Sequence, residues 1–176
     1  MGLKVGEVKL EKYNEEWEDI FEKEREELVK IFEEKAIIIE HIGSTSVPGL
    51  SAKSIIDIAV GVLDLNDFEE IKDKCKEQYS IKENPTKGEE LIIKRENNDI
   101  TTHLIHVMEV DSKRCRDTIL FRNYLRTHDD VLKEYENLKK KLAKKYKNDR
   151  PKYTASKNDF IQEVIIKAYE EIWLNK

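Results

Sequence analysis

Two apolar runs rich in β-branched residues, 36–42 and 55–63, enclose a loop of small and hydroxyl side chains. Apolar runs of this length, bounded by glycine, predict buried strands. The segment 41–61 holds three of the six glycines and one of the three prolines of the chain. Small residues let a ligand approach the backbone closely, and backbone N–H groups together with hydroxyls bind phosphate well. We therefore expect a phosphate-binding loop between two buried strands.

The hydrophobic pattern of the whole chain predicts that strands dominate the first part and helices the last. Strands are expected at 5–10, 36–42, 55–63, 79–82, 91–94 and 101–110, with a turn at Asn84-Pro85, and helices at 14–32, 64–78, 116–127, 131–146 and 160–173. This order indicates an α+β fold, a mixed sheet flanked by helices with a helical C-terminal part. A chain of 176 residues fits one domain, here 1–176.

The composition argues against a nucleic-acid-binding surface and against a membrane protein. There are 37 acidic against 32 basic residues, a net charge of −5, so the lysine-rich stretch 139–147 is expected to be a solvated helix face. No stretch approaches the ~20 apolar residues that cross a bilayer. Residues 1–10 lack the apolar core of a signal peptide. Cys75 and Cys115 are isolated, which is typical of free thiols in a cytoplasmic protein.

The loop and the second strand carry a specific signature. It reads His41-Ile42-Gly43-Ser44-Thr45-Ser46-Val47-Pro48-Gly49-Leu50, then Ala52-Lys53, then Ile55-Ile56-Asp57-Ile58. This signature resembles that of the GrpB family, a small bacterial branch of the nucleotidyltransferase superfamily. The resemblance continues through 105–107, 121–128 and 153–160, and Asn123 stands where the family usually has an acid. Tyr13 with Trp17 resembles the opening helix of the family, so the match spans essentially the whole chain.

The resemblance implies a nucleotidyltransferase-like mixed sheet with added helices. It also implies that Gly43, Ser44 and Thr45 hold the phosphates of a ligand and that Asp57, as a catalytic residue, binds Mg²⁺. A buried acid needs a partner or a metal. Pairing of Asp57 with Lys53 or an arginine is the alternative to a ligand-site role.

The second metal-binding carboxylate is missing from the expected position. Metal-assisted nucleotidyl transfer needs two metal ions about 3.5–4 Å apart, held by carboxylates on a common face. On a strand the second acid would stand two residues after Asp57, where this chain has Ala59. Either Glu40 or Glu109 supplies it from elsewhere, or a single Mg²⁺ is held by one carboxylate, ligand phosphates and water.

Four further residues are candidates for the site, each with a structural alternative. His106 would orient or deprotonate an acceptor, or be a satisfied core histidine. Lys53 would meet a phosphate as a point charge, or be solvated. Arg122 and Arg126 stand at i and i+4 on one helix face, which suits a polyphosphate, although salt bridges to the many acids explain them equally well.

His41 adjoins the loop and is, like His106, a candidate for a site role or a satisfied core histidine. Tyr153 and Lys157 form another i, i+4 pair, which we do not expect to contact a ligand. His103 and His128 are expected to be peripheral.

Two functions remain open on the sequence. The first is binding of a phosphate-bearing small molecule, a nucleotide or coenzyme-like compound, with transfer of a nucleotidyl or phosphoryl group if the protein is an enzyme. The second is a non-catalytic module for ligand binding or protein interaction, which kept the fold and lost the second carboxylate at Ala59.

Overall fold

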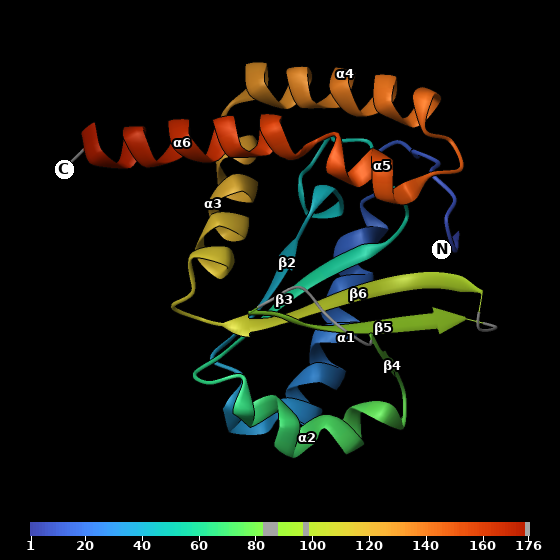
Figure 1. Cartoon of the computed structure of the whole chain (residues 1–176), viewed down its shortest axis with the longest axis vertical. Coiled ribbons are helices and arrows are strands. Elements are labelled where there is room, and N and C mark those ends of the chain that lie inside the picture. Colours follow the sequence, from blue (N-terminus) through green and yellow to red (C-terminus); the bar gives the residue numbers. More distant parts are fainter. Residues whose placement is uncertain (83–87, 97–98, 175–176) are drawn as a thin grey trace.

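The computed structural model describes residues 1–82, 88–96 and 99–174. Figure 1 shows α4, α5 and α6 together at one end of the molecule and α2 at the other, with the sheet between them. The elements in chain order are β1 (Leu3–Lys4), α1 (Glu16–Phe32), η1 (Glu33–Lys35), β2 (Ile38–Ile42), η2 (Ser44–Ser46), β3 (Ile56–Val62), α2 (Asn66–Lys76), β4 (Ser80–Ile81), β5 (Glu90–Glu96), β6 (Ile100–Glu109), α3 (Lys113–Thr127), α4 (Asp129–Lys145), α5 (Arg150–Ala155) and α6 (Asn158–Leu174).

The sheet is mixed and runs in the order β2-β3-β6-β5-β4, with β1 added beside β6. The pair β3 and β6 is parallel, and the other pairs are antiparallel. In this register Ile42 lies opposite Asp57, and Ala59 lies beside His106. The sheet therefore brings the acid of the second predicted strand and the histidine of a distant strand onto neighbouring positions.

Alternation along β3 divides its side chains between two faces of the sheet. Ile56, Ile58 and Val60 are fully buried in the main core, which α1 and α2 complete with Trp17 and Phe68 among other apolar side chains. This is the apolar face that fixes β3 in the centre of the sheet, because a slip of one residue would move Asp57 into the core.

The opposite face carries Asp57 and Ala59 and is covered by the C-terminal helices. Ala59 packs with Ile42, Met108 and Cys115. A further cluster joins the loop before β3 to α3, α4 and α6, and it contains Val47, Leu50, Leu125, Val131, Tyr135 and Val164. The helical C-terminal part is thus docked on the loop and on this face of the sheet.

The predicted α+β fold with a mixed sheet flanked by helices is confirmed. Three local predictions are wrong. Lys139, in the stretch expected to be a solvated helix face, is 1% exposed and donates to the carbonyl of Ser51. Residues 5–10 do not form a strand, because Gly6 turns the chain at a positive φ of 85° and the edge strand is β1 instead. The short helix α5 was not expected, and it begins where Asp149 accepts the backbone N–H of Lys152 and a proline follows. The turn predicted at Asn84-Pro85 lies outside the described residues.

Within the described ranges, no helix combines the length and the apolar character needed to cross a membrane. Cys75 and Cys115 are free, as predicted, and both are buried.

Candidate functional site

A cavity of about 720 Å³ lies between the Asp57 face of the sheet and the C-terminal helices. Its wall takes residues from the loop after β2, from β3 and β6, and from α3, α5 and α6. The predicted residues Gly43, Ser44, Thr45, Lys53, Asp57, His106 and Arg122 line it, and Arg126 is absent from that lining. The tertiary structure therefore gathers most of the predicted site from segments as far apart in the sequence as Gly43 and Arg122.

Gly43 and Asp57 are in direct contact at the mouth of the loop. Gly43 has φ of +69°, and a β-carbon there would lie 2.5 Å from Oδ2 of Asp57. No side chain fits this position without displacing the carboxylate, and the conformation itself favours glycine. Because Gly43 has no side chain, the Asp57 carboxylate lies directly against the backbone of the loop.

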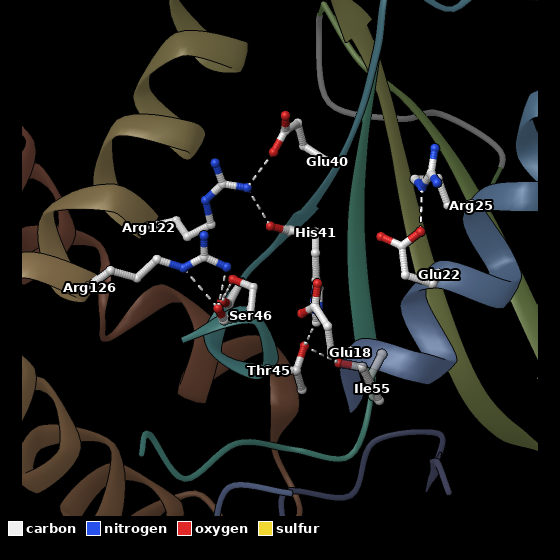
Figure 2. A network of polar contacts seen from close by, with 11 residues as sticks. Glu18, Glu22, Arg25, Glu40, His41, Thr45, Ser46, Ile55, Arg122 and Arg126 are labelled. Atoms are coloured by element: carbon white, nitrogen blue, oxygen red, sulfur yellow. Dashed lines mark hydrogen bonds and ion pairs between the residues drawn. The ribbon is translucent and has the colours of Figure 1, made fainter. Parts of the chain in front are cut away.

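The loop is anchored by its own hydroxyls, as Figure 2 shows. Thr45 is buried, and its Oγ1 lies 3.0 Å from Nε2 of His41. Ser46 Oγ donates to the carbonyl of Gly43 at 2.7 Å. His41 faces α1, where its Nδ1 lies 3.2 Å from Oε2 of Glu18. Because burial outweighs the attraction of Glu18, the pKa of His41 is lowered. His41 and Thr45 therefore hold the loop on α1.

The two arginines hold the other side of the loop (Figure 2). The buried Arg122 donates from Nη1 to the carbonyl of His41 and to Oε2 of Glu40, both at 2.7 Å. Arg126 donates from Nε and Nη2 to the carbonyl of Ser46, at 3.0 and 2.6 Å. Both guanidinium groups are thus bound to acceptors of the protein, and their predicted role in neutralising a polyphosphate stays a prediction.

A line of charged groups extends from Asp57 through His106 and Glu89 to Arg114. Oδ1 of Asp57 lies 3.7 Å from Nε2 of His106, whose Nδ1 contacts Glu89, and Glu89 is paired with Arg114. Burial alone would lower the pKa of His106, but its contacts with the two carboxylates outweigh that and raise the pKa to about 9. A raised pKa favours the imidazolium form of His106 at neutral pH, in which both ring nitrogens donate, and its predicted role in orienting or deprotonating an acceptor stays a prediction.

The same neighbours act on the acids. Burial would raise the pKa of Asp57, yet His106, Lys53 and Lys157 together lower it. Glu89 is 4% exposed, and His106 and Arg114 likewise outweigh burial and lower its pKa. Glu89 stands beside Glu90 in a polar stretch, and no pattern in the sequence links it to His106.

Two lysines and an arginine complete the charged part of the cavity. Lys53, Lys157 and Arg150 all line it. The ammonium groups of Lys157 and Lys53 lie 4.5 and 5.7 Å from the ring centre of Tyr153. Lys157 was not expected to contact a ligand, because spacing along a helix gives no information about what the helix faces.

The donor set does not fit a two-metal centre. Ala59 is fully buried among apolar side chains, Glu40 is paired with Arg122, and Glu109 is exposed at the end of β6. Throughout the described ranges, no group of three or more His, Cys, Asp or Glu side chains could hold a metal ion. Mg²⁺ held by Asp57 with ligand phosphates stays a prediction, and it would have to bind beside the positively charged His106.

These features define an α+β protein whose mixed sheet and C-terminal helices enclose a ligand-sized cavity rich in cationic groups. A family model described as GrpB protein matches residues 7–167. The chain belongs to the GrpB family, as the signature predicted.

Similar proteins extend over nearly the full length of this chain. It is 39% identical to the glutamate-rich protein GrpB of Alkalihalophilus pseudofirmus, over 94% of this chain and 98% of that protein. It is 36% identical to the UPF0157 protein YqkA of Bacillus subtilis, over 85% of this chain and 44% of that protein. The crystal structure of the conserved protein GrpB from Enterococcus faecalis has a TM-score of 0.84 at 30% identity, covering 94% of this chain and 99% of that one.

Proposed function

We propose that the cavity binds a phosphate-bearing small molecule of nucleotide or coenzyme size. The observation that carries this proposal is the charge of the cavity wall, which has six lysine and arginine side chains against two aspartates. The basic residues are Lys53, Lys113, Arg114, Arg122, Arg150 and Lys157, and the acids are Asp57 and Asp117. Lys113, Arg114 and Arg122 are paired with Asp117, Glu89 and Glu40, which leaves Lys53, Arg150 and Lys157 against Asp57. This remaining surplus in a confined space favours an anion, and the cavity volume is in the range of small-molecule sites.

The apolar part of the wall supports the same size and type of ligand. Val47, Phe121, Leu125, Ile161 and Ile165 line the cavity on the side of α3 and α6. Nucleotides and coenzymes combine charged phosphates with a ring or chain that gains from apolar contact. A ligand of this kind would place its phosphates toward Gly43 and Lys53 and its uncharged part toward the helices.

Transfer of a nucleotidyl or phosphoryl group is the second candidate function. It is supported by Asp57, whose carboxylate faces the cavity beside Gly43 and Ser44 at the end of β2, as the resemblance to nucleotidyltransferases implies. The absence of a second carboxylate at Ala59 favours binding without transfer. The charged helices as a docking surface for a partner protein remain the alternative.

Thermal unfolding in the presence of ligands tests the proposal. We expect ATP, GTP or coenzyme A to raise the midpoint of wild type, because a ligand that binds only the folded state stabilises it. Asp57→Asn changes the charge at the site, whereas Lys152→Gln removes an exposed lysine of α5 and serves as the control. Absence of any shift with all three ligands, with and without Mg²⁺, would contradict the proposal.

We also propose that the protein acts in the cytoplasm. Two buried free cysteines suit a reducing compartment. Fractionation of the native host with an antibody against the chain tests this.

A further inference from the structure

We infer that Lys53 and Lys157 form an anion clamp, which binds a phosphate group of the ligand directly and makes a divalent cation unnecessary there. This inference rests on the proposed function and specifies how the same cavity holds its ligand. Lys53 lies in the loop before β3, and Lys157 lies between α5 and α6. The two lysines therefore line the cavity from the loop and from the C-terminal helices.

Tyr153 fixes the clamp. Its side chain is 1% exposed, so its ring has a set place in the wall. Lys157 Nζ lies 4.5 Å from the ring centre and Lys53 Nζ lies 5.7 Å from it. An aromatic face attracts ammonium groups at such distances, which holds both lysines against the same ring.

Positive charge at the clamp is incompletely neutralised. Asp57 is the acid that acts on both lysines, and Arg150 adds to the positive charge near Lys53. In the part of the chain that the structure describes, neither ammonium is engaged in an ion pair or a hydrogen bond. Burial lowers the pKa of both lysines, and repulsion from Lys53 contributes to a pKa of about 8 for Lys157. An anion between them would relieve that repulsion.

The clamp supplies the charge that a metal would bring. Mg²⁺ at a phosphate contributes two positive charges, and two ammonium groups contribute the same, with lysine acting as a point charge on the phosphate. The clamp and His106 surround Asp57 with three cationic groups, each of which repels an incoming divalent cation. A site that holds phosphate through two lysines needs no second metal-binding carboxylate, which agrees with the alanine at position 59.

Calorimetric titration distinguishes a lysine clamp from a metal site. Wild type is titrated with inorganic tripolyphosphate, ATP and coenzyme A, once in EDTA and once in excess MgCl₂. We expect at least one of the three to bind in EDTA with an affinity within threefold of that in Mg²⁺. Lys157→Gln and Lys53→Gln should each weaken this binding at least tenfold in EDTA.

Two controls separate loss of charge from loss of structure. Lys157→Arg keeps the charge and should retain most of the affinity, whereas Lys152→Gln, on the exposed side of α5, should leave the affinity unchanged. Circular dichroism melts identify any variant that fails to fold. If a glutamine variant does not fold, the affinities of Lys157→Arg and wild type are compared instead, at pH values above and below 8.

The outcomes separate the two proposals. Binding that requires Mg²⁺, or that survives both glutamine variants, overturns the clamp and leaves the proposed function in place. Failure of all three compounds to bind in either buffer overturns the proposed function together with the clamp.

Discussion

Gly43 and Asp57 are packed so closely that a β-carbon on Gly43 would lie 2.5 Å from Oδ2 and 2.9 Å from Cβ of Asp57. Gly43 directly follows β2 and Asp57 lies on β3, so the contact links the loop to the acid beside an antiparallel pair of strands. The identity of one residue in the loop thereby sets the position of the carboxylate in the cavity.

Gly43→Ala should destabilise the protein more than Gly49→Ala. Both glycines have positive φ, 69° and 80°, so either substitution carries backbone strain of about 1–3 kcal/mol. A β-carbon at Gly49 meets nothing within 4 Å, whereas one at Gly43 collides with Asp57. Urea unfolding of both variants measures the difference. Equal losses would show that the contact with Asp57 costs nothing to displace.

His106→Gln should remove a pH-dependent part of the stability. The folded pKa of His106 is about 9, above its ordinary value of 6.5. Its contribution is therefore fully present below pH 6.5 and is lost as the pH rises through 9, on the order of 3 kcal/mol at most. Unfolding free energies of wild type and variant at pH 6, 7.5 and 9.5 test this.

The quantity to compare is the difference between the two proteins at each pH. Burial lowers the pKa of Lys139 to about 7 and that of Lys157 to about 8, so these lysines make stability rise with pH in wild type and variant alike. If the difference in unfolding free energy between wild type and His106→Gln stays constant from pH 6 to 9.5, Asp57 and Glu89 do not raise the pKa of His106.

Arg122→Met should destabilise the protein in the absence of any ligand. The guanidinium donates to the His41 carbonyl and to Glu40, and hydrogen bonds from charged groups contribute about 1.5–3 kcal/mol. Arg116→Met is the matched control, because Arg116 is exposed on the same helix. Chemical denaturation of the free protein decides the role. Unchanged stability combined with weaker ligand binding would favour phosphate neutralisation by Arg122.

Ala59→Asp introduces the missing carboxylate and tests whether the site can then hold Mg²⁺. Ala59 is fully buried beside Met108 and Cys115, so the new acid should lower the unfolding free energy by about 2–4 kcal/mol. Ala59→Asn has the same shape without the charge. Thermal melts with and without Mg²⁺ separate the two effects. Stabilisation of the aspartate variant by Mg²⁺ to the wild-type level, with regained transfer activity, would indicate a degenerate enzyme.

Local patterns account for what could be predicted from the sequence. The apolar alternation of β3 buries Ile56, Ile58 and Val60 and turns Asp57 to the other face, because side chains on a strand alternate. The same reasoning placed Arg122 and Arg126 on one helix face, and both do reach the loop (Figure 2). The ion pair of Arg122 with Glu40 is of the kind that the salt-bridge alternative described. The other acceptors, the carbonyls of His41 and Ser46, carry no sequence signal, so those contacts could not be predicted.

Contacts between distant segments account for the rest. Glu89 lies 17 residues from His106 and is fixed to it only by the pairing of β5 with β6, which sets the protonation of the histidine. Lys157 lies more than 100 residues from Lys53, and both lie near the ring of Tyr153 only because α5 and α6 fold back over the loop.

The sequence alone determined the family, the α+β class and the pairing of a glycine loop with one buried acid, since these depend on local pattern and on a signature. The tertiary structure decided which charges surround that acid. Charge compensation depends on distance in space, and Asp57 meets His106, Lys53 and Lys157 only once the sheet and the C-terminal helices have closed the cavity.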